Sequence, residues 1–455
     1  MSRLATGLAV AVVVHGLLAC GAPEAERPAN LLLIVLDTVR SDHASAYGYD
    51  RDTTPTLRAL AERGVRFERA YAATATTGPS MATLFTSLYP RAHGVLKNGL
   101  RLGSEHQTLA EILSARGYQT AAVLGSFVLD RRFGFAQGFD TYDDAFDLFE
   151  ASLHTDHFGE EEVGGAFDRR AEATSARAIR FLEEQRNAQR PFFLFLHYFD
   201  PHDPYAPPAS HAGRFAAAAG DPDRLQDAIR RYDEEIAYTD EQIGRVLAAL
   251  EGDGIAERTL VVVTADHGEG LMEHGYMYHG LQIYEGSVRI PLILAWPGVL
   301  PGGRVVGAPV QLVDLVPTLV DLLGMEVDAG RFQGESLARA VRGDAALDPE
   351  RAVFFQRQHY EGGPEARIRA RGERFAMRAG RWKIIVGPEE DRVELYDLDS
   401  DPAERAELAA DLPELAGELA ERVASWRARV ERPEAAIGTV DPADRERLEA
   451  LGYVE

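Results

Sequence analysis

Aspartate and histidine residues follow three apolar runs of the chain, at the point where each run ends. They are Asp37 after residues 31–36, His197 and His202 after residues 192–196, and Asp266 and His267 after residues 260–264. In an open α/β sheet, ligands bind outside the carboxyl ends of the strands, so these residues are expected at one edge. A single aspartate after a strand usually only caps a helix. Three coinciding cases, two of them with histidine, favour a metal site.

The segment 74–87 could add a hydroxyl nucleophile. It reads TATTGPSMATLFTS, and a helix is expected to begin near Pro79, since proline favours the first helical turn. A hydroxyl at such a helix end meets free N–H groups and the positive end of the helix dipole, which favour an oxyanion and a bound anion. The alternative is a threonine that only caps the helix, and this segment alone favours the cap.

Apolar runs alternate with helical stretches over most of the chain, which is typical of an α/β domain with a mostly parallel central sheet flanked by helices. The predicted strands are residues 31–36, 121–124, 192–196, 260–264 and 291–295, and the predicted helices include residues 56–63, 108–115, 174–185 and 233–250. Later strand-like pieces at 352–356, 374–378, 382–386 and 393–397 precede a helical stretch at 413–430. This second pattern predicts a small antiparallel sheet with one covering helix. We place the larger domain at residues 30–343, a small α+β subdomain at 344–432 and a C-terminal arm at 433–455.

The N-terminal residues predict export. An apolar run over residues 4–18 follows Arg3 and is interrupted by His15; it is shorter than the roughly 20 residues of a bilayer span. Residues 1–19 are therefore a predicted signal peptide. The tetrapeptide Leu-Leu-Ala-Cys ending at Cys20 resembles a bacterial lipobox, which implies lipidation of Cys20, a tether over residues 20–29, and a lipoprotein at the periplasmic face or outer membrane. An ordinary signal peptide that happens to contain the chain's single cysteine is the alternative.

The composition is that of a soluble globular protein, with 45% hydrophobic and 26% charged residues among 455. A net charge of −24 argues against nucleic acid or anionic lipid as the main partner, so the membrane is expected to be reached through the lipid anchor only. An anionic substrate stays compatible with this charge, because a buried cation can invert the local field. The basic pairs at 131–132 and 169–170 are predicted to lie on the surface.

The order of these pieces resembles the sulfatases, within the alkaline phosphatase superfamily. The resemblance is carried by Asp37, by T-x-P-S at residues 77–80, by Pro201-His202 and by Asp266-His267-Gly268. Further matches follow in order at residues 88–94 (LYPRAHG), 117–121 (GYQTA), 284–292 (YEGSVRIPL), 380–383 (GRWK) and 394–398 (ELYDL). These matches cover nearly the whole chain beyond the leader. They imply the family's fold, a divalent metal ion and an anionic ester as substrate, with residues 30–343 as the catalytic domain.

The nucleophile position departs from the sulfatase pattern. In C/S-x-P-S-R the first residue becomes formylglycine, but Thr77 stands there and threonine cannot be oxidised to that aldehyde. Met81 replaces the arginine. Other superfamily branches, such as the nucleotide pyrophosphatases, use an unmodified threonine or serine to attack phosphorus. The resemblance therefore implies no formylglycine, and Thr77 as a covalent nucleophile that favours phosphate mono- or diesters.

The metal ligands implied by the resemblance are Asp37, Thr77, Asp266 and His267. Sulfatases generally hold calcium with oxygen ligands, whereas here Thr38 replaces a second aspartate and His267 replaces an asparagine. An imidazole suits zinc, manganese or iron better than calcium, with calcium or magnesium as the alternatives. One divalent ion is expected, and a second ion, with His202 or His279 as a ligand, is the alternative.

Two further histidines are implied to act on the substrate. His202 matches the family's Pro-His that contacts the ester, and His279 lies near the position of a lysine that binds the substrate anion, which suggests a cationic or hydrogen-bonding role. His197 is expected to support the metal ligands from behind or to be structural. The family's Lys-x-His pair after the second strand is absent, since residues 123–127 read VLGSF.

Taken together, the residues predict a metal-dependent hydrolase of sulfuric or phosphoric esters. Two alternatives stay open at this point. One is a phosphoryl transferase that acts on envelope lipid or glycan, and the other is a degenerate protein that only binds an anionic glycan.

Overall fold

The computed structural model describes residues 29–146, 154–155, 162–163, 168–216, 223–360, 371–430 and 440. The predicted signal peptide, Cys20 and all but one residue each of the tether and the C-terminal arm lie outside the described residues. No helix in the described part of the chain combines the length and the apolar character that crossing a bilayer requires.

An eight-stranded sheet in the order β12-β2-β11-β9-β1-β8-β4-β5 forms the centre of the molecule. Its strands are β1 (Asn30–Leu36), β2 (Val65–Phe67), β4 (Gln119–Val123), β5 (Thr141–Asp143), β8 (Phe192–Tyr198), β9 (Thr259–Ala265), β11 (Leu292–Ala295) and β12 (Arg304–Val306). The central strands β9, β1 and β8 run parallel to each other and are buried along their whole length. Such strands are covered on both faces, which is why their sequences are near-continuous apolar runs. Only β11 runs antiparallel to its neighbours, β9 and β2.

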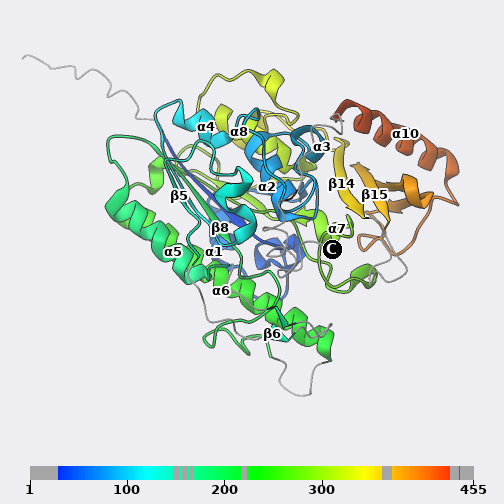
Figure 1. Ribbon diagram of the computed structural model, residues 1–455, viewed down its shortest axis with the longest axis horizontal. Coiled ribbons are helices and arrows are strands. Elements are labelled where there is room, and N and C mark those ends of the chain that lie inside the picture. The colour runs from blue at the N-terminus through cyan, green and yellow to red at the C-terminus, as the bar shows by residue number, and fades with distance from the viewer. Residues whose placement is uncertain are drawn as a thin grey trace, which may run out of the picture.

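Helices cover both faces of this sheet, with α1, α5 and α6 on one face and α2, α4 and α8 on the other (Figure 1). The helices of this part are α1 (Pro55–Glu62), α2 (Thr77–Thr86), α3 (Pro90–His93), α4 (Leu109–Ser114), α5 (Ala171–Arg180), α6 (Arg224–Gly252), α7 (Glu285–Val288), α8 (Leu315–Leu322) and α9 (Ala338–Arg342). A π-helical turn at Phe181–Gln185 continues α5. Helix α2 is buried at every position, so it lies inside the protein and brings its N-terminus to the sheet edge.

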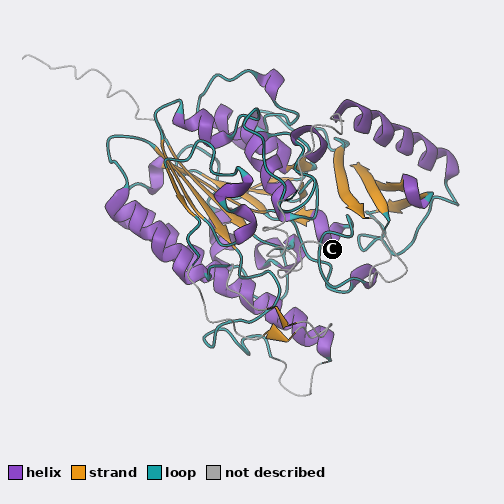
Figure 2. Cartoon of the chain, viewed as in Figure 1, coloured by secondary structure: helices purple, strands orange, loops and turns teal. Residues whose placement is uncertain are grey.

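A second, antiparallel sheet is set beside the first and carries one long helix on its outer face (Figure 2). It consists of β14 (Val353–Tyr360), β15 (Gly372–Ala379), β16 (Trp382–Gly387) and β17 (Arg392–Asp397), and the helix is α10 (Pro413–Val430). Trp426 of α10 stacks on Phe354 with ring centroids 4.9 Å apart. The opposite face of the sheet packs Phe355 and Tyr396 against Tyr284 and other residues of the larger part. The predicted fold class is confirmed.

Two small sheets complete the described strands. Their strands are β3 (Ala70–Tyr71), β10 (Arg289–Ile290) and β13 (Val310–Gln311) in one, and β6 (His154–Thr155) and β7 (Glu162–Val163) in the other. The structure also corrects two local expectations. Helix α2 begins at Thr77 rather than near Pro79, and Arg169 is buried rather than on the surface, because it donates hydrogen bonds to Asp143.

Candidate active site

Three neighbouring strands end at the same level and bring their polar residues together. In the register of the sheet, Val35 of β1 lies opposite His197 of β8, and Leu36 lies opposite Ala265 of β9. Asp37 and Asp266 are therefore the first residues beyond two adjacent strands. Asp37, His197 and Asp266 each offer a ligand atom within 4.8 Å of the others, and all three side chains are fully buried.

Helix α2 adds Thr77 to this cluster. Thr77 is the first residue of the helix, and its Oγ1 lies 3.3 Å from Nε2 of His267. Ser80, one turn further on, donates a 2.5 Å hydrogen bond to the backbone carbonyl of Asp266 and so ties the helix to the end of β9. The Nε2 atom of His267 also lies 3.4 Å from Oδ2 of Asp266 and 3.9 Å from Oδ1 of Asp37. All four predicted ligands are therefore in one place.

The buried cluster has the properties of a cation site. Both carboxylate oxygens of Asp37, Oδ2 of Asp266 and both ring nitrogens of His197 are buried and lack a hydrogen-bond partner among the described residues. Burial, with the neighbouring charge of Asp266 adding to it, raises the pKa of Asp37 well above its usual range. Buried carboxylates without a counter-charge are strongly unfavourable, and a divalent ion would supply that charge. The donor set of carboxylate oxygens and imidazoles fits such an ion.

The histidines of the cluster are suited to bind a cation. Burial lowers the pKa of His197 to about 4, so its ring is neutral, as a metal ligand must be. The Nδ1 atom of His267 lies 2.9 Å from the carbonyl oxygen of Gly268. A carbonyl only accepts, so Nδ1 carries the proton and Nε2 keeps its lone pair toward Thr77 and the aspartates. The sequence predicts that His197 supports the ligands or is structural. Its position against Asp37, 3.4 Å from Oδ2, also makes it a further candidate ligand.

Thr38 occupies a strained backbone position beside the cluster. Its φ is +59°, which is uncommon for a β-branched residue and marks a conformation that its surroundings must enforce. In this conformation its backbone N–H donates to Oδ1 of Asp266 at 3.2 Å, and its hydroxyl donates to the carbonyl of Pro201 at 2.9 Å. Thr38 therefore orients an aspartate and anchors the loop of His202 without offering a carboxylate of its own.

Two more predicted residues, His202 and His279, line up with His267. The ring centroid of His279 lies 4.6 Å from that of His267 and 4.9 Å from that of His202. His202 stacks on Phe199, and its Nδ1 lies 2.6 Å from the carbonyl of Asp203. The structure therefore brings every predicted site residue within the described chain into one centre.

Asn98 is a site residue that the sequence did not reveal. Its Oδ1 accepts a 2.7 Å hydrogen bond from the backbone N–H of Gly78, the residue after Thr77. Its Nδ2 is buried and has no partner among the described residues. A buried amide donor without a partner is costly, so a ligand oxygen beside Thr77 is its natural acceptor.

Replacing Asn98 by alanine is expected to lower kcat/KM for ester hydrolysis by about 10²-fold, the usual loss for one donor to a charged oxygen in an active site. The measurement is steady-state kinetics of the two proteins at saturating metal. Because Asn98→Asp keeps the acceptor for Gly78 but removes the donor, it should lose at least as much. An Asn98→Ala protein with unchanged kcat/KM would show that this amide only holds the helix.

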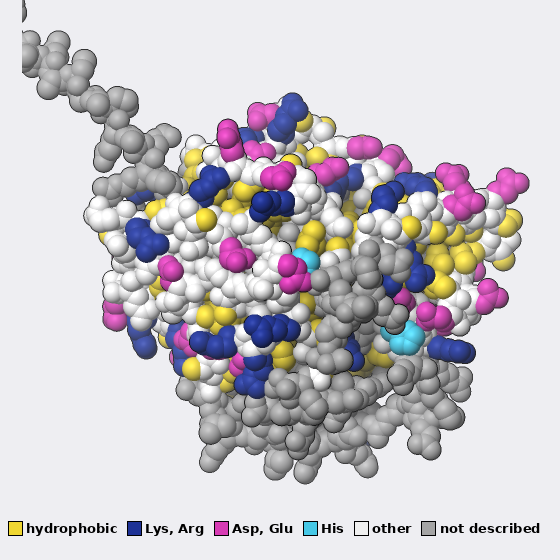
Figure 3. Space-filling model, turned by 45° about the horizontal axis from the view of Figure 1, so that its top comes forward, with side chains coloured by type: hydrophobic (Ala, Val, Ile, Leu, Met, Phe, Trp, Pro, Cys, Tyr) yellow, Lys and Arg dark blue, Asp and Glu magenta, His cyan; other side chains and the backbone are white. Residues whose placement is uncertain are grey.

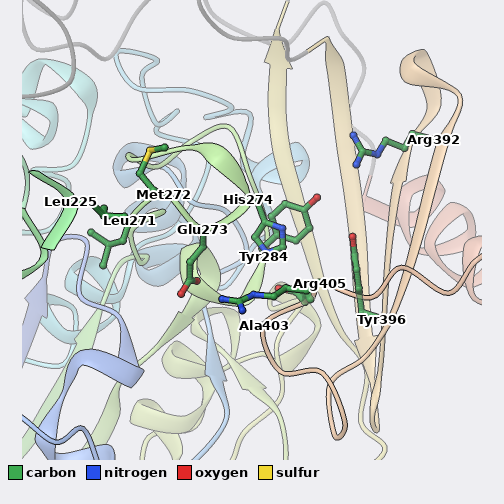
Figure 4. Close-up of a pocket in the computed structure, with 11 residues that line it drawn as sticks. Leu225, Leu271, Met272, Glu273, His274, Tyr284, Arg392, Tyr396, Ala403 and Arg405 are labelled. Atoms are coloured by element: carbon green, nitrogen blue, oxygen red, sulfur yellow. The ribbon is translucent and has the colours of Figure 1, made fainter. Parts of the chain in front are cut away.

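A cavity of about 620 Å³ lies between the two parts of the chain (Figure 4). Its lining combines Met272 and His274, from the loop that links His267 to His279, with Tyr284 and with Arg392 and Tyr396 of the second sheet, among others. The loop residues Leu271, Met272 and His274 have positive φ angles. The cavity is thus formed jointly by both parts of the chain.

Comparisons with known proteins agree with this geometry. The family model described as sulfatase matches residues 29–325, and the model described as the C-terminal part of N-sulphoglucosamine sulphohydrolase matches residues 272–429. The fold and the buried Asp-His-Asp cluster are those of an ester hydrolase of the alkaline phosphatase superfamily. Within that class, the chain belongs to the sulfatase family.

Curated relatives match over most of their length. An N-acetylglucosamine-6-O-sulfatase of Bacteroides thetaiotaomicron is 26% identical, and the match covers 85% of this chain and 84% of the relative. A choline-sulfatase of Rhizobium meliloti is 25% identical, with 84% and 82% covered. The crystal structure of a phosphonate monoester hydrolase of Agrobacterium radiobacter superposes with a TM-score of 0.73 at 24% identity, covering 89% of this chain and 96% of that one. The predicted enzyme class, a sulfatase-like hydrolase acting on ester bonds, is confirmed.

Proposed function

We propose that this chain is a divalent-metal-dependent hydrolase of phosphorus esters in which Thr77 is the covalent nucleophile. The observation that carries the proposal is the position of Thr77: its hydroxyl stands at the first turn of α2, 3.3 Å from Nε2 of His267. The sequence resemblance assigns this residue to the formylglycine position of the family. A threonine hydroxyl is chemically competent to attack phosphorus without prior oxidation.

The residues that would hold the ion are Asp37, Asp266, His267 and Thr77, with His197 as a further candidate. Zinc, manganese or iron suit the imidazole ligands better than calcium or magnesium. A bound divalent ion would act as a Lewis acid that lowers the pKa of the Thr77 hydroxyl and offsets the charge of the ester.

The chain's own residues then divide the reaction into two steps. Thr77 loses its hydroxyl proton to solvent, and its Oγ1 forms a bond to phosphorus while the bond from phosphorus to the leaving oxygen breaks. His202, in its protonated form, gives that oxygen a proton and regains one from solvent. The N–H of Thr77 at the start of α2 and the amide of Asn98 would hold the non-bridging oxygens. Water then cleaves the Thr77 ester and restores the enzyme.

The charges of the site favour singly charged esters. The predicted ligands and the histidines beside them include no lysine or arginine. The Lys-x-His pair that the family carries after the second strand and its motif arginine are missing from the sequence. With few fixed cations, the site cannot balance the two negative charges of a phosphate monoester. It therefore favours phosphodiesters or phosphonate monoesters, which carry one. The phosphonate monoester hydrolase among the structural neighbours supports this choice.

A panel of esters with one common leaving group tests the proposal. We expect bis(4-nitrophenyl) phosphate and 4-nitrophenyl phenylphosphonate to be turned over with at least tenfold higher kcat/KM than 4-nitrophenyl sulfate, because Thr77 attacks phosphorus directly. Elemental analysis of the same preparation should find about one divalent ion per chain. A higher kcat/KM for the sulfate would contradict the proposal.

The same panel tests the second candidate, hydrolysis of a sulfated sugar. This candidate is favoured by the curated relatives, one of which is an N-acetylglucosamine-6-O-sulfatase. A structural neighbour was solved with its substrate D-glucosamine-2-N,6-O-disulfate. Release of sulfate from such a sugar by a protein whose Thr77 is unmodified would support it.

We further propose that the enzyme is exported and held at the membrane through a lipid on Cys20. The support is the lipobox-like tetrapeptide that ends at Cys20. Nucleic acid is not a proposed partner, because the net charge is −24. In addition, basic side chains on the face shown in Figure 3 are interspersed with acidic ones. Esters of the cell envelope or its surroundings are then the substrates within reach.

A further inference from the structure

The carboxylate of Glu269 is buried beside the active site and surrounded by hydrogen-bond donors. It follows β9 in the motif Asp266-His267-Gly268-Glu269 and is fully buried. Tyr205 donates its hydroxyl to Oε2 at 3.0 Å, and the N–H of Gly270 points to Oε1 at 3.2 Å. The Nδ1 atom of His279 lies 3.3 Å from the same Oε1.

These contacts fix the orientation and the tautomer of His279. Oε1 of Glu269 already accepts from the N–H of Gly270, so it is an acceptor toward Nδ1 of His279 as well. Nδ1 therefore carries the proton, and the neutral ring has its lone pair on Nε2. The Nε2 atom lies on the edge of the ring turned away from Glu269. The ring itself packs against His267, whose Nε2 is in contact with Thr77.

Backbone hydrogen bonds close the loop that carries His279, from Gly270 N–H to Tyr278 O at 3.1 Å, Leu271 N–H to Met277 O at 2.7 Å and Met272 N–H to Tyr276 O at 2.9 Å. The N–H of Gly270 is shared between Tyr278 O and Oε1 of Glu269. Burying a carboxylate costs free energy unless it is hydrogen-bonded. Glu269 meets this requirement through Tyr205, Gly270 and the site histidine His279.

We infer that Glu269, held by Tyr205, positions His279 to accept the proton of the water that cleaves the phosphoryl-Thr77 intermediate. This inference rests on the proposed function. In the step, the water oxygen forms a bond to phosphorus and the bond between phosphorus and Thr77 Oγ1 breaks. One water proton passes to Nε2 of His279 and from there to the departing Thr77 oxygen. Glu269 touches neither substrate nor water and is a positioning residue.

The test separates the two chemical steps in the metal-loaded enzyme. Bis(4-nitrophenyl) phosphate is mixed with wild type, Glu269→Gln, His279→Ala and the double variant, and nitrophenolate release is followed from the first turnover. The first turnover should stay within about threefold of wild type, while the steady-state rate falls about 10²-fold in both single variants, as expected for loss of a proton acceptor. Intact-mass measurement after acid quench should show the aryl phosphoryl adduct accumulating in both.

Matched variants distinguish positioning from mere structural support. Because Glu269 acts through His279, the double variant should be within about threefold of His279→Ala alone. Tyr205→Phe should cause a smaller loss of the same kind. The control is Glu394→Gln, which alters another buried carboxylate that accepts from tyrosines, Tyr284 and Tyr396, near the cavity of Figure 4. It should leave both phases within about threefold of wild type.

The outcomes distinguish failure of the positioning role of Glu269 from failure of the proposed function. Equal slowing of both phases in Glu269→Gln, or a double variant with multiplied losses, would overturn the positioning role. If wild type forms the adduct on Thr77 but the variants hydrolyse it at the wild-type rate, the positioning role would be overturned as well. The proposed function would then remain intact. Turnover with no adduct in any of the proteins would remove the proposed function, and this inference with it.

Discussion

Replacing Thr77 by alanine is expected to lower kcat for phosphorus esters by about 10⁴-fold or more, as losses of covalent nucleophiles do. Thr77 is the first residue of α2, and its hydroxyl oxygen lies 3.3 Å from Nε2 of His267. Thr77→Ser restores the hydroxyl and should recover activity to within about 10²-fold of wild type. Steady-state kinetics of the three proteins on bis(4-nitrophenyl) phosphate make the comparison.

A second threonine of α2 provides the control for this experiment. Thr83 is also fully buried, and its hydroxyl contacts Nε2 of His93 at 3.1 Å, away from the cluster. Thr83→Ala should cost stability, seen as a lower Tm, but leave kcat within about threefold. If Thr77→Ala kept substantial turnover of any ester in the panel, Thr77 would not be the nucleophile.

Replacing Asp37 by asparagine is expected to have opposite effects on activity and on the stability of the metal-free protein. With metal supplied, the variant should lose about 10³-fold or more in kcat/KM, because it lacks a charged ligand of the ion. Without metal, it should melt at a higher temperature than metal-free wild type. Two buried carboxylates then no longer lie side by side, and isosteric removal of one charge relieves the repulsion.

The pH dependence of this second effect follows from the direction of the pKa shift. Burial and the charge of Asp266 raise the pKa of Asp37, so the folded metal-free protein binds a proton that the unfolded chain has already lost. Its stability therefore falls as pH rises above the ordinary pKa of aspartate, and the advantage of Asp37→Asn should grow from pH 5 to pH 8.

Thermal melting with and without chelator, together with metal analysis, measures both effects. Metal should raise the Tm of wild type by mass action and should raise that of Asp37→Asn much less. Asp314→Asn is a useful comparison, since Asp314 is a buried carboxylate paired with Arg351 rather than with a second carboxylate. Its removal should lower the Tm. A Tm of wild type that does not respond to chelation would contradict the metal site.

The sheet and most of the site could be predicted because buried parallel strands have a plain sequence signature. Strands β1, β8 and β9 are near-continuous apolar runs, and the aspartates that follow two of them must lie at one edge. Strands β2, β5 and β12 have three residues each, too few to show a period. They were therefore missed, although they extend the same sheet.

The residues that the sequence did not reveal were missed for different physical reasons. Both faces of β8 are buried, so the sequence does not show which face His197 joins. Asn98 lies in a loop, and only its contact with Gly78 brings it to Thr77. Glu269 directly follows the motif Asp266-His267-Gly268. Its partner His279 is ten residues away, however, and Tyr205 is far away in the sequence. Arg169 is buried because Asp143 reaches it from another segment.

Covalent attachment of phosphorus to Thr77 can be tested by locating the bond itself. Wild-type, metal-loaded protein is mixed with bis(4-nitrophenyl) phosphate, quenched in acid within the first turnovers and digested for peptide mass mapping. We predict an aryl phosphoryl group on the peptide that contains residues 77–86, assigned by fragmentation to Thr77 and absent from Thr77→Ala. A modification at any other residue, or turnover of the ester with this peptide unmodified throughout, would contradict the account.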